Sequence, residues 1–457
     1  MTTDDVLNTD DLKRCPIDFE RHGPRFRDEF AEKAQELHAK CPLAWSESYE
    51  GHWVASGMNE VFALARQTDS VTSFRDVDGL VNGYKGISIP SFKMEGPYRE
   101  PSFLELHPPE QTDYRKAINP YLSPAAVSRW VPVIEELVRA CLDEKIESGS
   151  IDFVYDLANV VPAVVTMGLL GLPLTDWVIH NEPAHALMYT PPHSPDFARV
   201  RKMNEDSRAA LADWIKKIRV EPRPGLLDAL IKTTVVGQPL TDELITGTAS
   251  LLVGGGFDTT TALTGQSILW LSQHPEQRAR LIREIDTLLD GATEEFLRYF
   301  TPAQGDGRTI SQDMEVDGIQ LKEGERVWLS WAMANRSAEI FPNPDEVDFD
   351  RRANRHAAFG LGVHRCIGSN VARVVFKKML AAVLTRMPDF VVDTDKVVHY
   401  ESVAQINGLV NLPATFTPGK RLGPGLEETI ERVQKIVNEE RLAEPVTAQM
   451  AAAPEGA

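Results

Sequence analysis

Apolar residues recur with helical spacing over most of the chain beyond about residue 123. The clearest segment is apolar nearly all round and runs from Thr241 to the pair His274-Pro275. Thr241 is a good N-cap and Pro275 a good terminator, which predicts a helix of about 32 residues and, at ~1.5 Å per residue, a length of ~48 Å. Because this helix lacks a polar face, we expect it to pass through the core.

Shorter elements surround this central helix. The pattern predicts an amphipathic helix over 276–289 and another over 293–300. The first ~100 residues instead mix β-branched runs, such as HWVAS at 52–56, with turn signals, such as VDGLVNGYKG at 77–86. The sequence therefore predicts a mainly α fold with small β-sheets.

Three consecutive glycines, 254–256, stand in the middle of the predicted central helix. Glycine costs about 1 kcal/mol relative to alanine inside a helix, so a buried helix tolerates such a run only where something compensates.

Residues 1–420 show no repeat, linker or shift in composition, so we predict a single domain there. Residues 421–457 differ, and we predict a C-terminal helical and disordered extension. Four apolar residues fall on one face of its helix: Leu426, Ile430, Val433 and Val437. We favour a helix that docks on the domain over one that binds a partner, and AEPVTAQMAAAPEGA has the composition of a disordered tail.

The composition argues against some classes of binding partner. The 457 residues include 48 basic and 67 acidic side chains, a net charge of −19, which argues against nucleic acid or an anionic membrane as the main partner. No apolar run approaches the ~18 residues of a membrane span, and the N-terminus has no apolar signal region. We expect a soluble, cytoplasmic protein, and a monomer.

The four cysteines are Cys15, Cys41, Cys141 and Cys366, and none forms a CxxC pair. A disulfide scaffold or structural zinc site is therefore not expected, and the usage fits a reducing compartment. Cys366 stands apart because glycines at 360, 362 and 368 surround it, with a helical run directly after it.

Glycines allow the backbone to approach something bulky and flat, and amides at a helix N-terminus favour a thiolate. Cys366 could then be a nucleophile, with His364 as its base, or a metal ligand. The residues by themselves leave both readings open.

The run Phe359-Gly360-x-Gly362-x-His364-x-Cys366-x-Gly368 resembles the heme-binding loop of the cytochrome P450 family. Three further segments resemble motifs of that family, in the same order along the chain. Glu295-x-x-Arg298 resembles its ExxR pair, with Arg351 completing a salt-bridge network. GGFDTT at 255–260 resembles its oxygen-binding groove, and HPPEQTDYRKAIN at 107–119 the helix whose arginine reaches a heme propionate. The resemblance covers roughly residues 15–418.

The resemblance implies the cytochrome P450 fold, with the long central helix over heme b and Cys366 as axial thiolate. Three cations would pair with the propionates: Arg115, Arg308 and His364. Phe359 and Gly360 would lie against one side of the heme and Gly255 against the other. The chain departs from many bacterial relatives at Gln111, where they carry a histidine.

Asp258 and Thr259 would be the catalytic acid and alcohol that deliver protons while bound dioxygen is split. The alternative is that the Thr259 hydroxyl only bonds back to a helix carbonyl. The resemblance also implies six substrate-pocket residues, which suggest a small, mainly apolar organic substrate: Val81, Ile89, Leu251, Gly254, Gln405 and Ile406.

The activity implied is a monooxygenase that uses O₂ to hydroxylate, O-dealkylate or epoxidise its substrate. No flavin or iron–sulfur pattern occurs, so NAD(P)H-derived electrons would come through a separate ferredoxin and its reductase. A basic patch is predicted to dock that ferredoxin: Arg352, Arg355, Arg365, Arg373, Lys377 and Lys378.

The sequence is also compatible with other activities. Within the heme-thiolate class they are desaturation, oxidative coupling, peroxide-driven oxygenation and nitric-oxide reduction. Outside it they are a heme sensor or carrier without turnover, and a thiol hydrolase with Cys366 as nucleophile.

Overall fold

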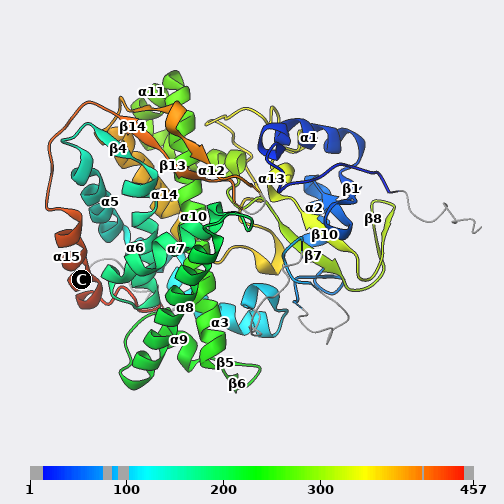
Figure 1. Cartoon of the computed structure of the whole chain (residues 1–457), viewed down its shortest axis with the longest axis horizontal. Coiled ribbons are helices and arrows are strands. Elements are labelled where there is room, and N and C mark those ends of the chain that lie inside the picture. Colours follow the sequence, from blue (N-terminus) through cyan, green and yellow to red (C-terminus); the bar gives the residue numbers. More distant parts are fainter. Residues whose placement is uncertain (1–13, 76–84, 91–101, 404–405, 447–457) are drawn as a thin grey trace, which may run out of the picture.

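The computed structural model describes residues 14–75, 85–90, 102–403 and 406–446. Helices dominate, and the predicted mainly α fold with small sheets is confirmed (Figure 1). The helices are α1 Phe26–Lys40, α2 Met58–Arg66, α3 Glu110–Leu122, α4 Pro124–Ser128, α5 Val131–Lys145, α6 Val160–Leu170, α7 Trp177–Tyr189, α8 Phe197–Val220, α9 Leu226–Lys232, α10 Asp242–Gln273, α11 Pro275–Arg283, α12 Ile285–Phe300, α13 Trp331–Ala334, α14 Ser369–Arg386 and α15 Leu426–Glu439.

A five-stranded sheet, in the order β1-β2-β10-β7-β3, lies on the side of the molecule opposite the main group of helices (Figure 1). Its strand β10 pairs in parallel with β2 and antiparallel with β7. The strands are β1 Leu43–Ser46, β2 His52–Ala55, β3 Val71–Thr72, β4 Ser150–Asp152, β5 Thr234–Val235, β6 Gln238–Pro239, β7 Asp306–Ile310, β8 Met314–Val316, β9 Ile319–Leu321, β10 Arg326–Leu329, β11 Val391–Val392, β12 Val398–His399, β13 Leu409–Asn411 and β14 Pro413–Thr415.

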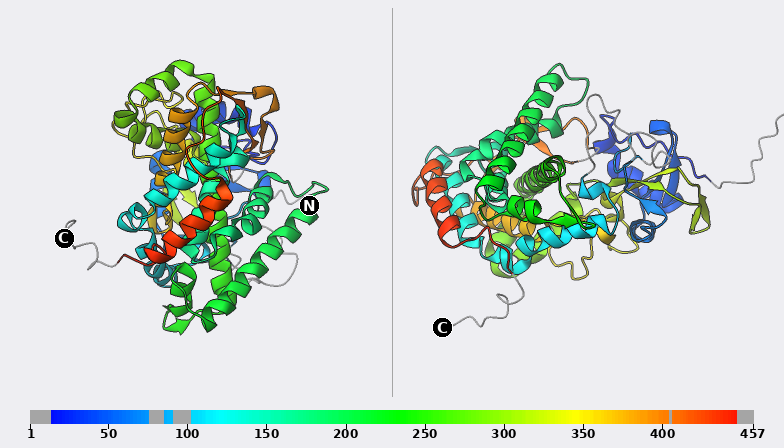
Figure 2. Two further views of the ribbon diagram at one scale, coloured as in Figure 1. Left: turned by 90° about the vertical axis from the view of Figure 1, so that its left-hand side faces the viewer. Right: turned by 90° about the horizontal axis from the view of Figure 1, so that it is seen from below.

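Helix α10 is the predicted central helix. It has 32 residues, and the Thr241 hydroxyl accepts a hydrogen bond from the Leu244 amide at 3.2 Å, so the N-cap is confirmed. It packs against α6, α7, α8, α12 and α14, and the view along its axis shows it enclosed by other helices (Figure 2). The prediction that this apolar segment passes through the core is therefore confirmed.

Two local predictions were wrong. The break between α11 and α12 lies at Glu284, and α12 continues through Gly291. A Cβ at Gly291 would stand 2.7 Å from the Phe349 carbonyl oxygen, so this glycine allows a close approach rather than ending a helix. The first hundred residues also contain α1 and α2, although α1 buries only three side chains and so shows a weak apolar pattern.

The C-terminal helix α15 packs along α5, as the docking interpretation predicted. Ile430, Val433 and Val437 are buried in the same core as α5, and Arg129 donates to the Glu440 carbonyl at 2.7 Å. The tail over 447–457 lies outside the described residues. The single domain over 1–420 stays a prediction.

Candidate active site

A cavity of about 310 Å³ lies between α10 and the loop that leads into α14. From α10 it is lined by Gly255, Gly256 and Thr259. From the loop it is lined by Phe359, Gly360, His364 and Cys366. The two segments that the sequence singled out, about 100 residues apart along the chain, thus both line one cavity.

Backbone geometry fixes the loop. Gly360 and Gly362 have φ of +67° and +70°, which side-chain-bearing residues rarely adopt. A Cβ at Gly362 would also stand 2.2 Å from the Ala65 carbonyl oxygen on α2. The Cys366 amide donates to the Phe359 carbonyl at 2.7 Å, so the thiol is held at a defined place in the wall.

The Cys366 thiol is free and exposed toward the cavity, although it lies deep in the protein. Burial raises its pKa, while the Gly368 amide and the charges of Arg365, Arg115 and Arg373 lower it. His364 does not face this thiol as a base would, since its Nε2 lies 3.0 Å from Ser73 Oγ. The geometry therefore does not form the nucleophile–base pair of a thiol hydrolase.

Cationic side chains gather beside the cavity. Burial and the charges of Arg308, His107 and Arg115 lower the pKa of His364 to about 3. Arg308 is buried, and the carboxylate near it, Asp306, already accepts from Trp331 Nε1 at 3.1 Å. His364 is therefore uncharged near neutral pH, and the positive groups that would suit an anionic ligand are Arg115, in the lining, and Arg308.

Gln111 acts differently from the histidine it replaces. Its side-chain amide donates to the Val363 carbonyl at 2.7 Å, inside the cysteine loop. Gln111 therefore ties α3 to that loop and leaves the cavity wall to Arg115.

Gly255 and Gly256 of α10 also line the cavity. A Cβ at Gly254 or Gly255 would meet nothing within 4 Å, whereas one at Gly256 would stand 2.8 Å from Thr166 Oγ1. Packing thus explains Gly256, while Gly255 leaves open space at the cavity. Thr259 Oγ1 donates to the Gly255 carbonyl at 2.9 Å, so the back-bond that was the alternative to a proton-relay role is present.

Asp258 points elsewhere. Its carboxylate is buried and accepts from the Tyr400 hydroxyl at 2.8 Å, and His185 Nδ1 lies 2.7 Å from it. Asp258 is not among the described residues that line the cavity. Asp258 therefore precedes a residue that lines the cavity, Thr259, but its own side chain does not line it.

Glu295, Arg298 and Arg351 form a buried ion network beneath this site. Glu295 and Arg298 are both fully buried and form a bidentate pair at 2.8 Å, and Arg351 Nε reaches Glu295 at 3.0 Å. Arg298 also donates to the carbonyls of Asn335, Pro344 and Glu346. The pair is thus unlike an ordinary exposed i,i+3 pair and ties α12 to the segment before the cysteine loop.

Of the predicted substrate-pocket residues, Leu251 lines the cavity, while Gly254 and Ile406 are absent from its described lining. Ile406 forms a bridge with Ala303, which does line it. Val81 and Gln405 lie outside the described residues.

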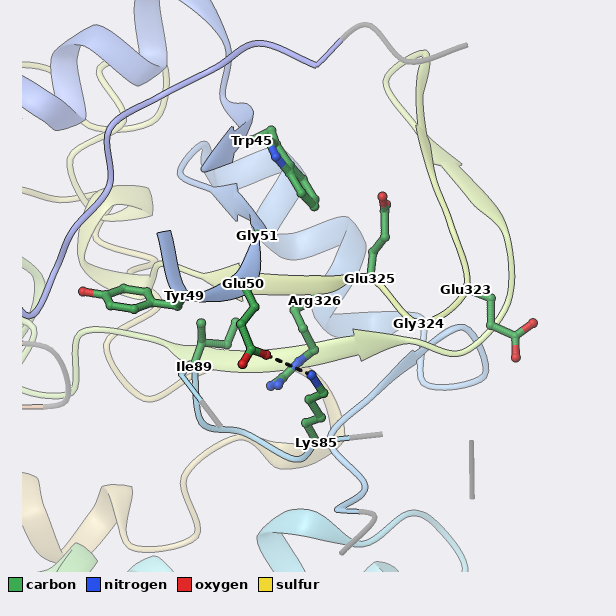
Figure 3. A pocket seen from close by; sticks show the side chains of 10 residues that line it. All are labelled: Trp45, Tyr49, Glu50, Gly51, Lys85, Ile89, Glu323, Gly324, Glu325 and Arg326. Atoms are coloured by element: carbon green, nitrogen blue, oxygen red, sulfur yellow. Dashed lines mark hydrogen bonds and ion pairs between the residues drawn. The ribbon is translucent and has the colours of Figure 1, made fainter. Parts of the chain in front are cut away.

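Ile89 lines a second cavity of about 380 Å³ beside the five-stranded sheet. Figure 3 shows its mixed lining, where Lys85 pairs with Glu50 at 3.3 Å close to Arg326. No thiol or imidazole from the described residues lines this second cavity, so it does not share the chemistry of the first.

Sequence reasoning missed His107, His185 and Tyr400. His107 heads the HPPEQ segment and lies near His364, so a search of that segment for further propionate partners could have found it. His185 and Tyr400 lie 73 and 142 residues from Asp258, and no local signal links them.

One thiol, the two arginines and a glycine-bearing helix wall define a site that fits a flat, anionic, thiolate-ligated cofactor. Among the described residues no group of three or more His, Cys, Asp or Glu is placed to hold a metal ion. Within the same residues no helix is long and apolar enough to cross a membrane.

Comparisons with known proteins agree with this class. The family model described as cytochrome P450 matches residues 175–414. The vitamin D3 dihydroxylase of Streptomyces griseolus is 33% identical over 69% of this chain and 77% of its own. The steroid C26-monooxygenase of Mycolicibacterium smegmatis is 30% identical over 70% and 80%. The structure of CYP109E1 from Bacillus megaterium in complex with testosterone is 26% identical, with a TM-score of 0.74 over 86% of this chain and 99% of that one.

The chain belongs to the cytochrome P450 family. It is an oxidoreductase that incorporates oxygen, and its cofactor is thiolate-ligated heme.

Replacing Gly255 by leucine is expected to obstruct the cavity without disturbing the packing of α10, because no atom lies within 4 Å of the added Cβ. We expect imidazole, titrated spectrally into the heme protein, to bind about tenfold more weakly, which corresponds to ~1.4 kcal/mol. Gly247→Leu is the matched control, since Gly247 is equally uncrowded but outside the cavity lining. Equal affinities in the two variants would contradict this placement of Gly255.

Proposed function

We propose that this protein is a monooxygenase that hydroxylates an apolar, ring-containing organic molecule with electrons from a separate ferredoxin. The observation that carries the proposal is that Thr259 and Cys366 both line one largely apolar cavity. O-dealkylation or epoxidation would use the same site.

Heme b, when bound, supplies oxygen activation at a thiolate-ligated iron. Cys366 would be its ligand, with Arg115, Arg308 and His364 paired to its propionates and Phe359, Gly360 and Gly255 against its faces. Because the Thr259 proton is already donated to the Gly255 carbonyl, its free lone pairs accept a hydrogen bond from a water or hydroxyl in the cavity. Thr259 thereby holds a proton donor in place, and Asp258 supplies the proton.

The lining supports an apolar substrate. Leucines from several elements face the cavity: Leu104, Leu122, Leu169, Leu170, Leu226, Leu251, Leu252 and Leu263. Relatives bear the names vitamin D3 dihydroxylase and steroid C26-monooxygenase, and one solved relative is in complex with testosterone. A sterol-like ring system is therefore the class we propose.

The proposed ferredoxin surface is smaller than the sequence suggested. Arg373 pairs with Glu294, Lys377 with Asp290 and Lys378 with Glu135, which neutralises half of the predicted patch. Arg352, Arg355 and Arg365 are exposed and form no ion pair within the described part of the chain. These three arginines support docking of an acidic partner on the cysteine side.

The test is a substrate screen followed by product analysis. Steroids and matched polar analogues are titrated into the heme protein, and the change of heme spin state reports binding. The best ligand is then turned over with NADPH, a ferredoxin and its reductase under ¹⁸O₂. We expect one ¹⁸O atom in the product. Binding with no oxygenated product would favour a sensor, and unlabelled, desaturated product a desaturase.

A further inference from the structure

Two of the four cysteines lie side by side at one edge of the five-stranded sheet. Cys41 follows α1 directly and stands two residues before β1, while Cys15 belongs to a segment, residues 15–17, that runs beside β1. The thiols of Cys15 and Cys41 are hydrogen-bonded to each other, and Lys40 lies close enough to Cys15 to interact with it electrostatically. Both cysteines are free and partly exposed, so the pair is open to reagents from solution.

The backbone holds Cys15 in this position. The Trp45 amide donates to the Cys15 carbonyl at 2.8 Å, and the Ile17 amide donates to the Trp45 carbonyl at 2.9 Å. These two bonds attach the segment 15–17 to β1, which is the outermost strand of the sheet. The segment therefore covers backbone groups of an edge strand that would otherwise be open to pairing with another chain.

Arg14 adds side-chain contacts to the same segment. It pairs with Glu325 at 2.6 Å and stacks on the Trp45 ring at 3.8 Å, but its side chain is 34% exposed. An ion pair with this exposure adds little stability. A covalent bond between Cys15 and Cys41 would add a constraint that these contacts do not supply.

The hydrogen bond between the thiols assigns a part to each sulfur. Burial and the bond to Cys15 raise the pKa of the Cys41 thiol to about 11, so Cys41 keeps its proton near neutral pH. The thiolate is the reactive form of a cysteine, so Cys15 is the sulfur of the pair that attacks an oxidant first. Cys41 is then the resolving thiol, already in contact with its target.

We propose that Cys15 and Cys41 form a reversible disulfide when the protein meets hydrogen peroxide, and that this bond locks the segment 15–17 onto β1. In the first step the Cys15 thiolate attacks the peroxide and the O–O bond breaks. Sulfenic acid forms at Cys15, and the released hydroxide takes up the proton that the Cys15 thiol had lost, giving water. In the second step the Cys41 sulfur attacks the Cys15 sulfur, the S–O bond breaks, and the Cys41 proton leaves with the hydroxide as a second water.

The two thiols are thereby oxidised, the peroxide is reduced to two waters, and a dithiol reductant reverses the bond. The disulfide would close a loop that contains all of α1, since residues 16–40 lie between the two cysteines. In a reducing compartment such a bond is transient and responds to the oxidant. The inference does not depend on the proposed monooxygenase activity.

The test is oxidation of the heme-loaded full chain, followed by peptide mapping. The reduced protein is treated with graded hydrogen peroxide, remaining thiols are blocked with N-ethylmaleimide, and the digest is examined by mass spectrometry before and after reduction. We expect two peptides joined through Cys15 and Cys41, which separate on reduction. Cys141→Ser is the matched control and should keep this cross-link, because Cys141 is fully buried in a different hydrophobic core.

Cys41→Ser separates a functional pair from two thiols that are oxidised independently. Without the resolving thiol, the sulfenic acid of Cys15 persists and dimedone captures it. We expect at least about tenfold more dimedone on Cys15 in Cys41→Ser than in the wild type, because a thiol held in contact reacts faster than a reagent from solution. Equal capture in the two proteins would overturn the proposal.

Urea unfolding measures the lock itself. A disulfide removes conformations from the unfolded chain, so the wild-type midpoint should rise on oxidation and return with dithiothreitol, while the midpoint of Cys15→Ser stays unchanged. An oxidised wild type with the midpoint of the reduced protein would contradict the proposal. A wild type whose only cross-link joins two chains on a non-reducing gel, or joins either cysteine to Cys141, would contradict it as well.

Discussion

Replacing Cys366 by serine is expected to abolish the strongly red-shifted Soret band that the reduced protein forms with CO. Serine keeps the size of the side chain and the amide bond to the Phe359 carbonyl, so the loop keeps its shape. Its neutral hydroxyl cannot donate charge to the iron as a thiolate does. We expect oxygenated product to fall by more than about 100-fold, because even the outer partners of metal ligands are worth 10–100-fold.

Cys15→Ser is the matched control, since Cys15 is a free, partly buried cysteine far from the cavity lining. It should retain both the CO band and the activity. Persistence of the red-shifted band in Cys366→Ser would assign the axial ligand to another residue.

The sequence predicted those parts of the site whose backbone geometry is set by residues within one short segment. Helix α10 could be placed because Thr241 and Pro275 mark its two ends. The cysteine loop could be recognised because Gly360 and Gly362 adopt a backbone conformation that other residues rarely adopt. Gly291 falls between the helices predicted over 276–289 and 293–300, but it lies inside α12, where it allows the Phe349 carbonyl to approach closely.

The parts that could not be predicted depend on distant partners. The Asp258 carboxylate lies away from the cavity only because α7 and the segment after β12 bring His185 and Tyr400 to it. The basic patch counted six cations, but Arg373, Lys377 and Lys378 meet acids from α12 and α5 in the folded chain. A count of basic residues in one sequence segment therefore overestimates the positive charge of the folded surface, because acidic side chains of neighbouring helices neutralise some of them.

Replacing Glu295 by glutamine is expected to have the largest effect on stability. The carboxylate neutralises the buried guanidinium groups of Arg298 and Arg351 and accepts from the Asp348 amide and the Asn354 side chain. A neutral amide would leave two buried cations without their counter-ion. Breaking one partner of a buried ion pair costs about 3–5 kcal/mol, and we expect a loss of that size in the free energy of unfolding from urea titrations followed by circular dichroism.

Glu294→Gln tests whether burial, rather than ion pairing as such, sets this cost. Glu294 is the preceding residue and is bonded to Arg373 at 2.6 Å and to the His356 ring at 3.1 Å, but the Arg373 and Glu294 side chains are 25% and 32% exposed. Solvent can then compensate the lost partner, so we expect about 1 kcal/mol or less. Equal losses in the two variants would mean that the network of Glu295 stabilises the fold no more than a surface pair. A larger loss for Glu295, together with loss of bound heme, would show that the network holds the segment before the cysteine loop in the position that the thiolate requires.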